Sequence, residues 1–131
     1  MPDTDLLTIR EMCDAFDVTP RTLRFDESKE LLSPQRKGTR RLFTRRDRAR
    51  LKLILRGKRF GLSLEDIRQT LDLYDRDGSN LPQILRTWQL GKDRLAAMQA
   101  QRAELDTAIA DLKAELEAVA ALIAAKQAEA G

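Results

Sequence analysis

Apolar residues recur at helical spacing in four stretches of the first 75 residues, and a helix-capping residue stands before each stretch. A Ser or Thr hydroxyl at such a position accepts a hydrogen bond from a backbone N–H that has no partner inside the helix. These residues are Thr8, Thr19, Thr44 and Ser63. Acidic partners for a capping box follow three residues later at Glu11, Asp47 and Asp66, and Pro20 suits a first turn. The pattern predicts helices over residues 8–16, 19–29, 44–59 and 63–75.

The four predicted helices form two closely joined pairs. The first pair is joined through "DV" and the second through "FGL", which is the spacing of a helix-turn-helix used twice. Between the pairs, "SPQRKGTRRLF" has a proline entry, a turn at Gly38 and an extended arm that ends in Leu42 and Phe43. These features favour a β-hairpin wing with a cationic tip. We therefore expect a winged helix-turn-helix head with a supporting second helix pair.

From Leu81 the apolar pattern changes to that of one long helix, with Ser79 or Asn80 as its cap and Pro82 in its first turn. The expected fold is thus mostly α: a head with a small wing, a second helix pair and a long C-terminal coiled-coil helix. We expect two domains, a winged helix-turn-helix head over residues 1–77 and a coiled-coil helix over residues 81–128.

An apolar seam follows this long helix in alternating steps of three and four residues, interrupted at Gly91 and Arg102. A repeat of about 3.5 residues keeps facing a partner helix only if the two helices supercoil, so a second copy of the chain is the simplest partner. Arg102 is expected to set register or orientation rather than to add stability. The predicted dimerisation residues are Leu95, Met98, Leu105, Ile109, Leu112, Leu116 and Val119.

The charge distribution indicates a nucleic-acid partner. The net charge is only +3, yet residues 36–59 hold twelve basic residues and a single acidic one, Asp47. Such density suggests a nucleic-acid footprint, and a solvated basic face is the alternative. One cysteine and no histidine exclude an internal disulfide and leave no ordinary zinc ligands or nucleophile and base pair. We expect neither enzyme activity nor a metal or other cofactor.

Two further features of the sequence indicate the cellular compartment. Asp3 and Asp5 precede any apolar stretch, so no signal peptide is expected, and the run "AVAALIAA" is too short to cross a bilayer. We expect a cytoplasmic protein with no membrane partner.

Cys13, within "REMCDAF", is interpreted as a small core residue, and a role as a redox sensor is the weaker alternative.

The motifs "LLTIREMCDAFDVTPRTLRF", "RRLFT" and "RDRARLKLILRGKRFGLSLEDI", followed by the long helix, resemble the MerR family of bacterial transcription regulators over essentially the whole chain. The resemblance implies a homodimer joined by an antiparallel coiled coil. It also implies binding to a pseudo-palindromic operator in double-stranded promoter DNA. Family dimers bend and untwist the promoter spacer so that RNA polymerase can engage both promoter elements, and repression without a ligand is common.

Helical geometry and the resemblance together suggest the DNA contacts. With Leu23 pointing inward, Arg21, Thr22 and Phe25 are expected on or near the opposite side of their helix, with Asp26 at its edge. Phe25 matches a family aromatic that can pack on the DNA backbone, and a core aromatic is the alternative. The candidates are Arg21, Thr22 and Arg24 for the groove and phosphates, Arg40 and Arg41 for flanking phosphates, Lys37 near the wing tip and Lys58 near the operator centre.

Asp26 departs from the family pattern, which most often has a tyrosine there. A carboxylate about 4 Å from a phosphate would cost about 1 kcal/mol in water and up to about 4 kcal/mol at an intermediate dielectric. Asp26 could instead turn away and pair with Arg40, Arg41 or Lys58, be a natural variant compensated by the basic segment, or be an introduced change. The alternative function is a dimeric protein-interaction module that has lost productive DNA binding through Asp26.

Overall fold

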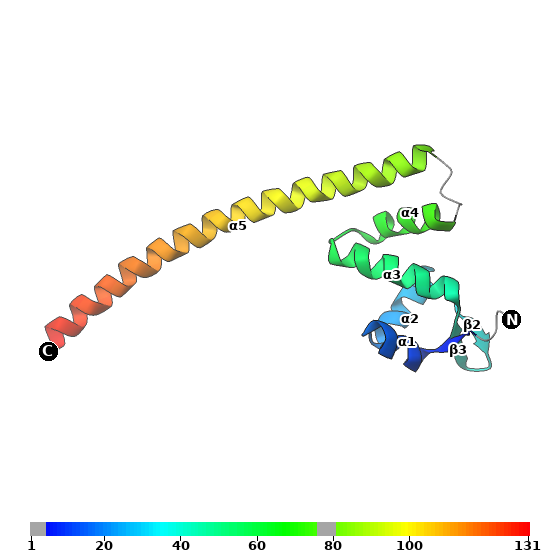
Figure 1. Ribbon diagram of the computed structural model, residues 1–131. Helices are drawn as coiled ribbons and strands as arrows, with labels where there is room; N and C mark the ends of the chain where they lie inside the picture. The colour runs from blue at the N-terminus through cyan, green and yellow to red at the C-terminus, as the bar shows by residue number, and fades with distance from the viewer. Residues whose placement is uncertain (1–4, 76–80) are drawn as a thin grey trace. The chain divides into compact units, whose positions relative to one another are not determined.

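The computed structural model describes residues 5–75 and 81–131. Its helices and strands follow the order expected from the sequence, with one additional short strand (Figure 1). The elements are β1 (Leu7–Thr8), α1 (Ile9–Phe16), α2 (Pro20–Ser28), β2 (Gln35–Lys37), β3 (Arg40–Phe43), α3 (Arg45–Arg59), α4 (Leu64–Asp75) and α5 (Leu81–Ala130). The predicted fold class, mostly helical with a small wing and a long C-terminal helix, is confirmed.

The helix starts follow from their capping residues. Thr8 and Thr44 each form a complete capping box, with Glu11 and with Asp47. The Oγ1 of Thr19 accepts a hydrogen bond from the backbone N–H of Thr22, and Ser63 Oγ accepts one from Asp66 at 3.1 Å. Each of these four helices therefore begins one residue after its predicted cap. The caps predicted for the long helix, Ser79 and Asn80, lie outside the described residues.

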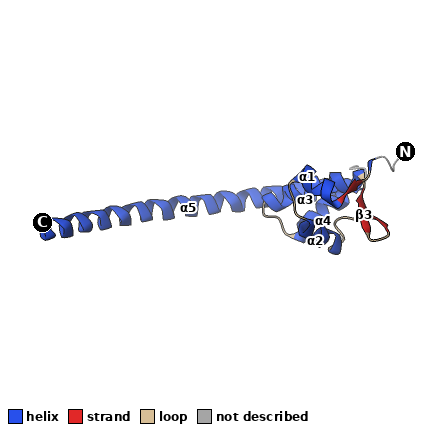
Figure 2. Cartoon of the chain, turned by 90° about the horizontal axis from the view of Figure 1, so that it is seen from below, coloured by secondary structure: helices blue, strands red, loops and turns tan. Residues whose placement is uncertain are grey.

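The wing is part of a three-stranded antiparallel sheet in the order β1-β3-β2. Gly38 has a φ of +66° in the turn between β2 and β3, a conformation that suits a residue without a Cβ. The hairpin stands out from the helices in Figure 2. Strand β1 was not predicted, because two residues are too few to show an alternating pattern. It pairs Leu7 with Phe43 and thereby attaches the chain before α1 to the wing.

The core of the head gathers residues from α1, α2, α3, α4, the end of β3 and the segment after α2. The buried apolar residues are Met12, Leu23, Leu31, Leu32, Phe43, Leu51, Ile54, Ile67 and Leu71. Helices α3 and α4 approach each other closely at Gly57, where there is no Cβ. A Cβ added at this residue would lie 2.6 Å from Cγ1 of Ile67. Cys13 packs against this core, and partial burial raises the pKa of its thiol, as suits a small packing residue.

Helix α5 differs from the head in its burial. The chain divides into two compact units, at residues 90 and 91, and no residue of α5 is buried. Its apolar side chains are exposed except that of Leu90, which is partly buried, and all seven predicted dimerisation residues are among the exposed ones. Among the described residues, no helix is long and apolar enough to span a membrane.

Candidate nucleic-acid interface

Helix α2 presents a polar, basic surface on the side away from the core. Leu23 is fully buried, as predicted, whereas Arg21 and Arg24 are exposed. Phe25 is 43% exposed, so the alternative that it is a core aromatic does not hold. The Nζ of Lys29 lies 5.6 Å from the centroid of the Phe25 ring, within the range of a cation–π contact. The second helix of the first pair therefore carries two exposed arginines and an exposed ring.

The wing carries its cations in two cross-strand pairs. Arg36 lies opposite Arg41, and Lys37 lies opposite Arg40. Because successive side chains of a strand point to opposite faces, these two pairs lie on different faces of the hairpin. Lys37 and Arg40 are both exposed. One face of the wing thus offers two cations to an anionic partner.

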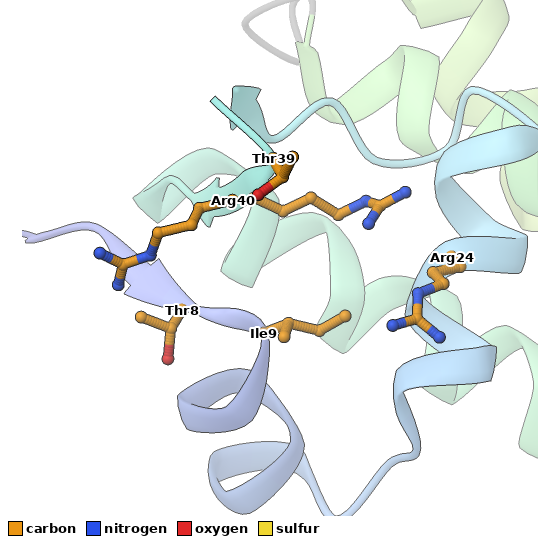
Figure 3. Close-up of a pocket in the computed structure, with 6 residues that line it drawn as sticks. Thr8, Ile9, Arg24, Thr39 and Arg40 are labelled. Carbon is orange, nitrogen blue, oxygen red and sulfur yellow. The ribbon is translucent and has the colours of Figure 1, made fainter. Parts of the chain in front are cut away.

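A hollow of about 220 Å³ lies between the wing and the first helix pair. Its lining residues are Thr8, Ile9, Arg24, Thr39, Arg40 and Arg41. Figure 3 shows that Arg24 enters from α2, Thr8 and Ile9 from β1 and the start of α1, and Thr39 and Arg40 from the wing. A guanidinium from the helix and one from the wing therefore border the same concave surface, an arrangement suited to phosphate oxygens.

Glu27 of α2 joins this helix to both strands of the wing. Its carboxylate accepts a hydrogen bond from Nη2 of Arg36 at 3.0 Å and from Nε of Arg41 at 2.8 Å. Arg41, which we expected to contact a phosphate, is therefore already held by an intramolecular ion pair, with its side chain 23% exposed. Glu27 was not among the functional residues predicted from the sequence. Its only signal was a carboxylate beside a basic segment, which does not distinguish it from other acidic residues.

Asp26 does not lie on the exposed face of α2 that carries Arg21 and Arg24, so its predicted position at the edge of that face is wrong. Its side chain is fully buried, and the Nζ of Lys58 donates to Oδ1 at 3.1 Å and to Oδ2 at 3.4 Å. Asp26 follows Leu23 by three residues and shares its inward face, which is the physical reason. Burial raises the pKa of Asp26, and the ion pair with Lys58 opposes that shift only in part.

Lys58, which we placed near the operator centre, therefore pairs with a buried carboxylate. Its side chain is 34% exposed. Of the partners considered for Asp26, the structure selects Lys58 rather than Arg40 or Arg41. The contact links α2 to the C-terminal part of α3.

The basic segment over residues 36–59 is not one continuous footprint. Arg50 is buried and donates from Nε to the backbone oxygen of Leu31 at 2.8 Å. Arg45 pairs with Asp5 at 2.5 Å, and Arg48 donates to the backbone oxygen of Asp5. Part of the positive charge therefore stabilises the head itself. Within residues 5–75 and 81–131, no group of three or more His, Cys, Asp or Glu side chains is placed to hold a metal ion.

The fold and this surface define the chain as a winged helix-turn-helix protein with a basic surface on its second helix and wing. The family comparisons are more specific. The profile described as "MerR HTH family regulatory protein" matches residues 7–74, and the one described as "MerR, DNA binding" matches residues 48–128. The chain belongs to the MerR family of regulatory proteins.

Two curated relatives are similar in sequence to this chain over 67 residues. The HTH-type transcriptional regulator ZntR of Escherichia coli (strain K12) is 36% identical over 67 residues, which cover 50% of this chain and 48% of ZntR. ZntR of Escherichia coli O157:H7 matches equally. The chain spans about half the length of the curated relatives it matches.

Solved structures share the fold. HiNmlR, described as a MerR family regulator lacking the sensor domain and bound to promoter DNA, has a TM-score of 0.61 at 24% identity, covering 79% of this chain and 78% of its own. A MerR family transcriptional regulator from Bacillus cereus has a TM-score of 0.60 at 27% identity, covering 76% of this chain and 74% of its own.

Proposed function

We propose that this chain is a sequence-specific DNA-binding transcriptional regulator that acts as a homodimer on a pseudo-palindromic operator in promoter DNA. The observation that carries the proposal is the set of exposed cations on α2 and on one face of the wing: Arg21, Arg24, Lys37 and Arg40. Arginine and lysine at such positions neutralise phosphates and fix a protein on the duplex, while side chains of the recognition helix can reach base edges.

The head, residues 1–77, supplies the DNA contacts in this proposal. Arg21 and Thr22 stand at the N-terminal end of α2, the end that a helix-turn-helix commonly directs at bases. Phe25 packs its exposed ring on the DNA backbone, and Arg40 and Lys37 bind flanking phosphates. HiNmlR, which shares the fold, is bound to promoter DNA in its own structure, and this supports the same use of the head.

The long helix, residues 81–128, supplies the dimer contacts. Seven apolar side chains of its seam are exposed in the single chain, and burying them against a second copy removes them from water. A two-fold dimer presents two identical heads, so its operator is expected to be a pseudo-palindrome. In this proposal the bound dimer also distorts the promoter spacer, and RNA polymerase then engages the distorted promoter. This part of the proposal rests on family membership.

The alternative function is an interaction module that has lost DNA binding, and the observation that motivated it was the expected exposure of Asp26. The structure does not support that observation. Asp26 was expected to repel a phosphate, but its carboxylate is buried and paired with Lys58. A buried, paired carboxylate presents little negative charge at the surface. The cations named above remain exposed on α2 and the wing.

The test is a selection of duplexes from a random-sequence library by the purified protein, followed by affinity measurements across a salt series. We expect a preferred sequence with dyad symmetry and a steep fall of affinity with salt, since each neutralised phosphate contributes about 0.9 to the slope of log K against log salt. Arg40→Ala should reduce that slope by about 1 for each head. Lys113→Ala, on α5, removes the same charge and should leave the slope unchanged.

Sedimentation of each variant checks that the dimer is intact. An intact dimer that shows no sequence preference and no salt-dependent affinity would contradict the proposed function and restore the interaction module.

A further inference from the structure

The wing hairpin contains an unfavourable arrangement of charge. Arg36 lies directly opposite Arg41, and the next pair, Lys37 and Arg40, also joins two cations. Like charges directly opposite each other destabilise an antiparallel pair of strands. The short hairpin therefore requires a compensating interaction from elsewhere in the head.

That interaction comes from the recognition helix. Both oxygens of Glu27 lie within hydrogen-bonding distance of Arg36 Nη2, at 3.0 and 3.3 Å, and of Arg41 Nε, at 3.4 and 2.8 Å. The Glu27 side chain is only 17% exposed. One carboxylate thus neutralises the repulsion between the two strands and attaches both of them to α2.

The contact leaves most of the donors of the two arginines available. A guanidinium has five N–H donors, and a carboxylate accepts through two oxygens. Arg41 uses its Nε toward Glu27, and Arg36 uses Nη2. The remaining N–H groups have fixed directions because the guanidinium is planar and its orientation is held. Glu27 therefore orients two arginines that can still donate to a phosphate.

We propose that Glu27 is a positioning residue for DNA recognition, which fixes the wing against α2 and orients Arg36 and Arg41 before DNA binds. The inference rests on the proposed function, since it specifies how two parts of one DNA-binding surface keep their spacing. Ordering long side chains and a mobile hairpin during binding lowers affinity, and an interaction that orders them beforehand removes that loss. Because the wing and α2 contact the duplex at different places, a fixed spacing also favours one binding register.

A simple electrostatic role predicts the opposite sign. A carboxylate on a DNA-facing helix repels phosphates, so neutralising it should raise affinity for every sequence. Under the positioning role, Glu27→Gln lowers affinity for the selected duplex even though the protein becomes more positive. Glu30→Gln is the matched control, because it removes the same charge from an exposed side chain close to the end of α2.

The first measurement uses the full chain without DNA. Backbone amide hydrogen exchange, read by NMR over residues 35–43, reports the local opening of the wing. We expect about tenfold faster exchange in Glu27→Gln and unchanged exchange in Glu30→Gln, with α1 and α3 amides unaffected in both. Unchanged exchange in Glu27→Gln would overturn the positioning role whatever the DNA measurements show.

The second measurement compares affinity for the duplex selected by the unchanged protein with affinity for a scrambled duplex of equal length. We expect Glu27→Gln to weaken binding to the selected duplex about tenfold and to reduce the ratio between the two affinities, with no loss in Glu30→Gln. Equal or stronger binding of Glu27→Gln to the selected duplex would overturn the inference. If the unchanged protein prefers no duplex, the proposed function fails and the DNA half of the inference fails with it, while the exchange result still decides the wing contact.

Thermal unfolding is recorded first for each variant. If Glu27→Gln is not folded at the assay temperature, Glu27→Asp replaces it. This variant keeps the charge but shortens the side chain by one methylene group, so a looser wing and weaker selected binding are again expected. Wild-type exchange and affinity in a folded Glu27→Asp would count against the positioning role.

Discussion

The head and helix α5 stabilise their structures in different ways. Among the residues that the structure describes, the head buries nine apolar side chains from elements that are distant in the sequence. In α5, which spans 50 residues, no residue is buried, and its apolar seam is exposed in the single chain. The head therefore contains its own core, whereas no part of the described chain covers the apolar seam of α5. Under the proposed function, a second copy of the chain covers this seam.

The same difference separates two kinds of charged contact. In the head, Asp26 and Glu27 form ion pairs with residues of other elements, and both side chains are mostly or fully buried. On α5, the ion pair between Lys126 and Glu129 joins neighbours on one helix, with both side chains at least 70% exposed. Exposed pairs of that kind contribute little, about 0.3–0.5 kcal/mol, so the pair between Lys126 and Glu129 adds little to the stability of α5.

The largest expected effect is on the seam. Leu105→Glu places a charge where the partner helix should pack, so we expect dimer dissociation to become at least about 100-fold more favourable, equivalent to about 3 kcal/mol. Sedimentation over a concentration series measures this change. Ala114→Glu is the control, because nine residues at about 100° each place it on the opposite side of the helix. Equal dimer affinity in the two variants would show that the seam is not the interface.

The next effect should appear in the head alone. Lys58→Ala removes the partner of the buried Asp26 carboxylate, and we expect the head to lose about 2 kcal/mol of unfolding free energy. The value lies below that of a fully buried pair because Lys58 is 34% exposed. Urea unfolding at fixed protein concentration measures it, with Lys52→Ala as a control on the exposed side of the same helix. Equal losses in both variants would mean that the contact contributes nothing specific.

Glycine substitutions should have opposite signs in the two regions. Gly57→Ala forces a Cβ to 2.6 Å from Ile67 Cγ1 and should destabilise the head by about 1.5 kcal/mol. Gly91→Ala meets nothing within 4 Å on α5 and should stabilise the helix by about 0.5–1 kcal/mol. Circular dichroism during urea unfolding measures both. Destabilisation by Gly91→Ala would indicate that its surface is already occupied, for example by the partner helix.

The smallest effect is a pH dependence of head stability. Burial raises the pKa of Asp26 above its ordinary value of 3.8. Between 3.8 and the folded pKa the native state therefore holds more protons than the unfolded state, so this group makes stability fall as pH rises through that window. Asp26→Asn removes the fall, and its stability relative to the unchanged protein should increase from about pH 3 to about pH 7. A constant difference in unfolding free energy across that range would contradict the assignment.

Local sequence patterns were enough to predict the helices, the hairpin turn, the apolar seam and the family. Thr8, Thr19, Thr44 and Ser63 each precede a helix that begins at the next residue, because a cap acts on backbone groups two or three positions away. The predicted wing and fold class were also confirmed. Such features depend on neighbours in the chain, so local spacing is enough to predict them.

Which charges remain at the surface depends on how the elements pack. Glu27 contacts residues 9 and 14 positions away, and Asp26 contacts one 32 positions away. Strand β1 likewise forms only because β3 is available to pair with it. The twelve cations that appeared as one footprint in the sequence include one that is buried and several that are held by carboxylates. Periodicity cannot predict these partners, because an ion pair requires two side chains to meet in space, and packing of the elements determines which ones do.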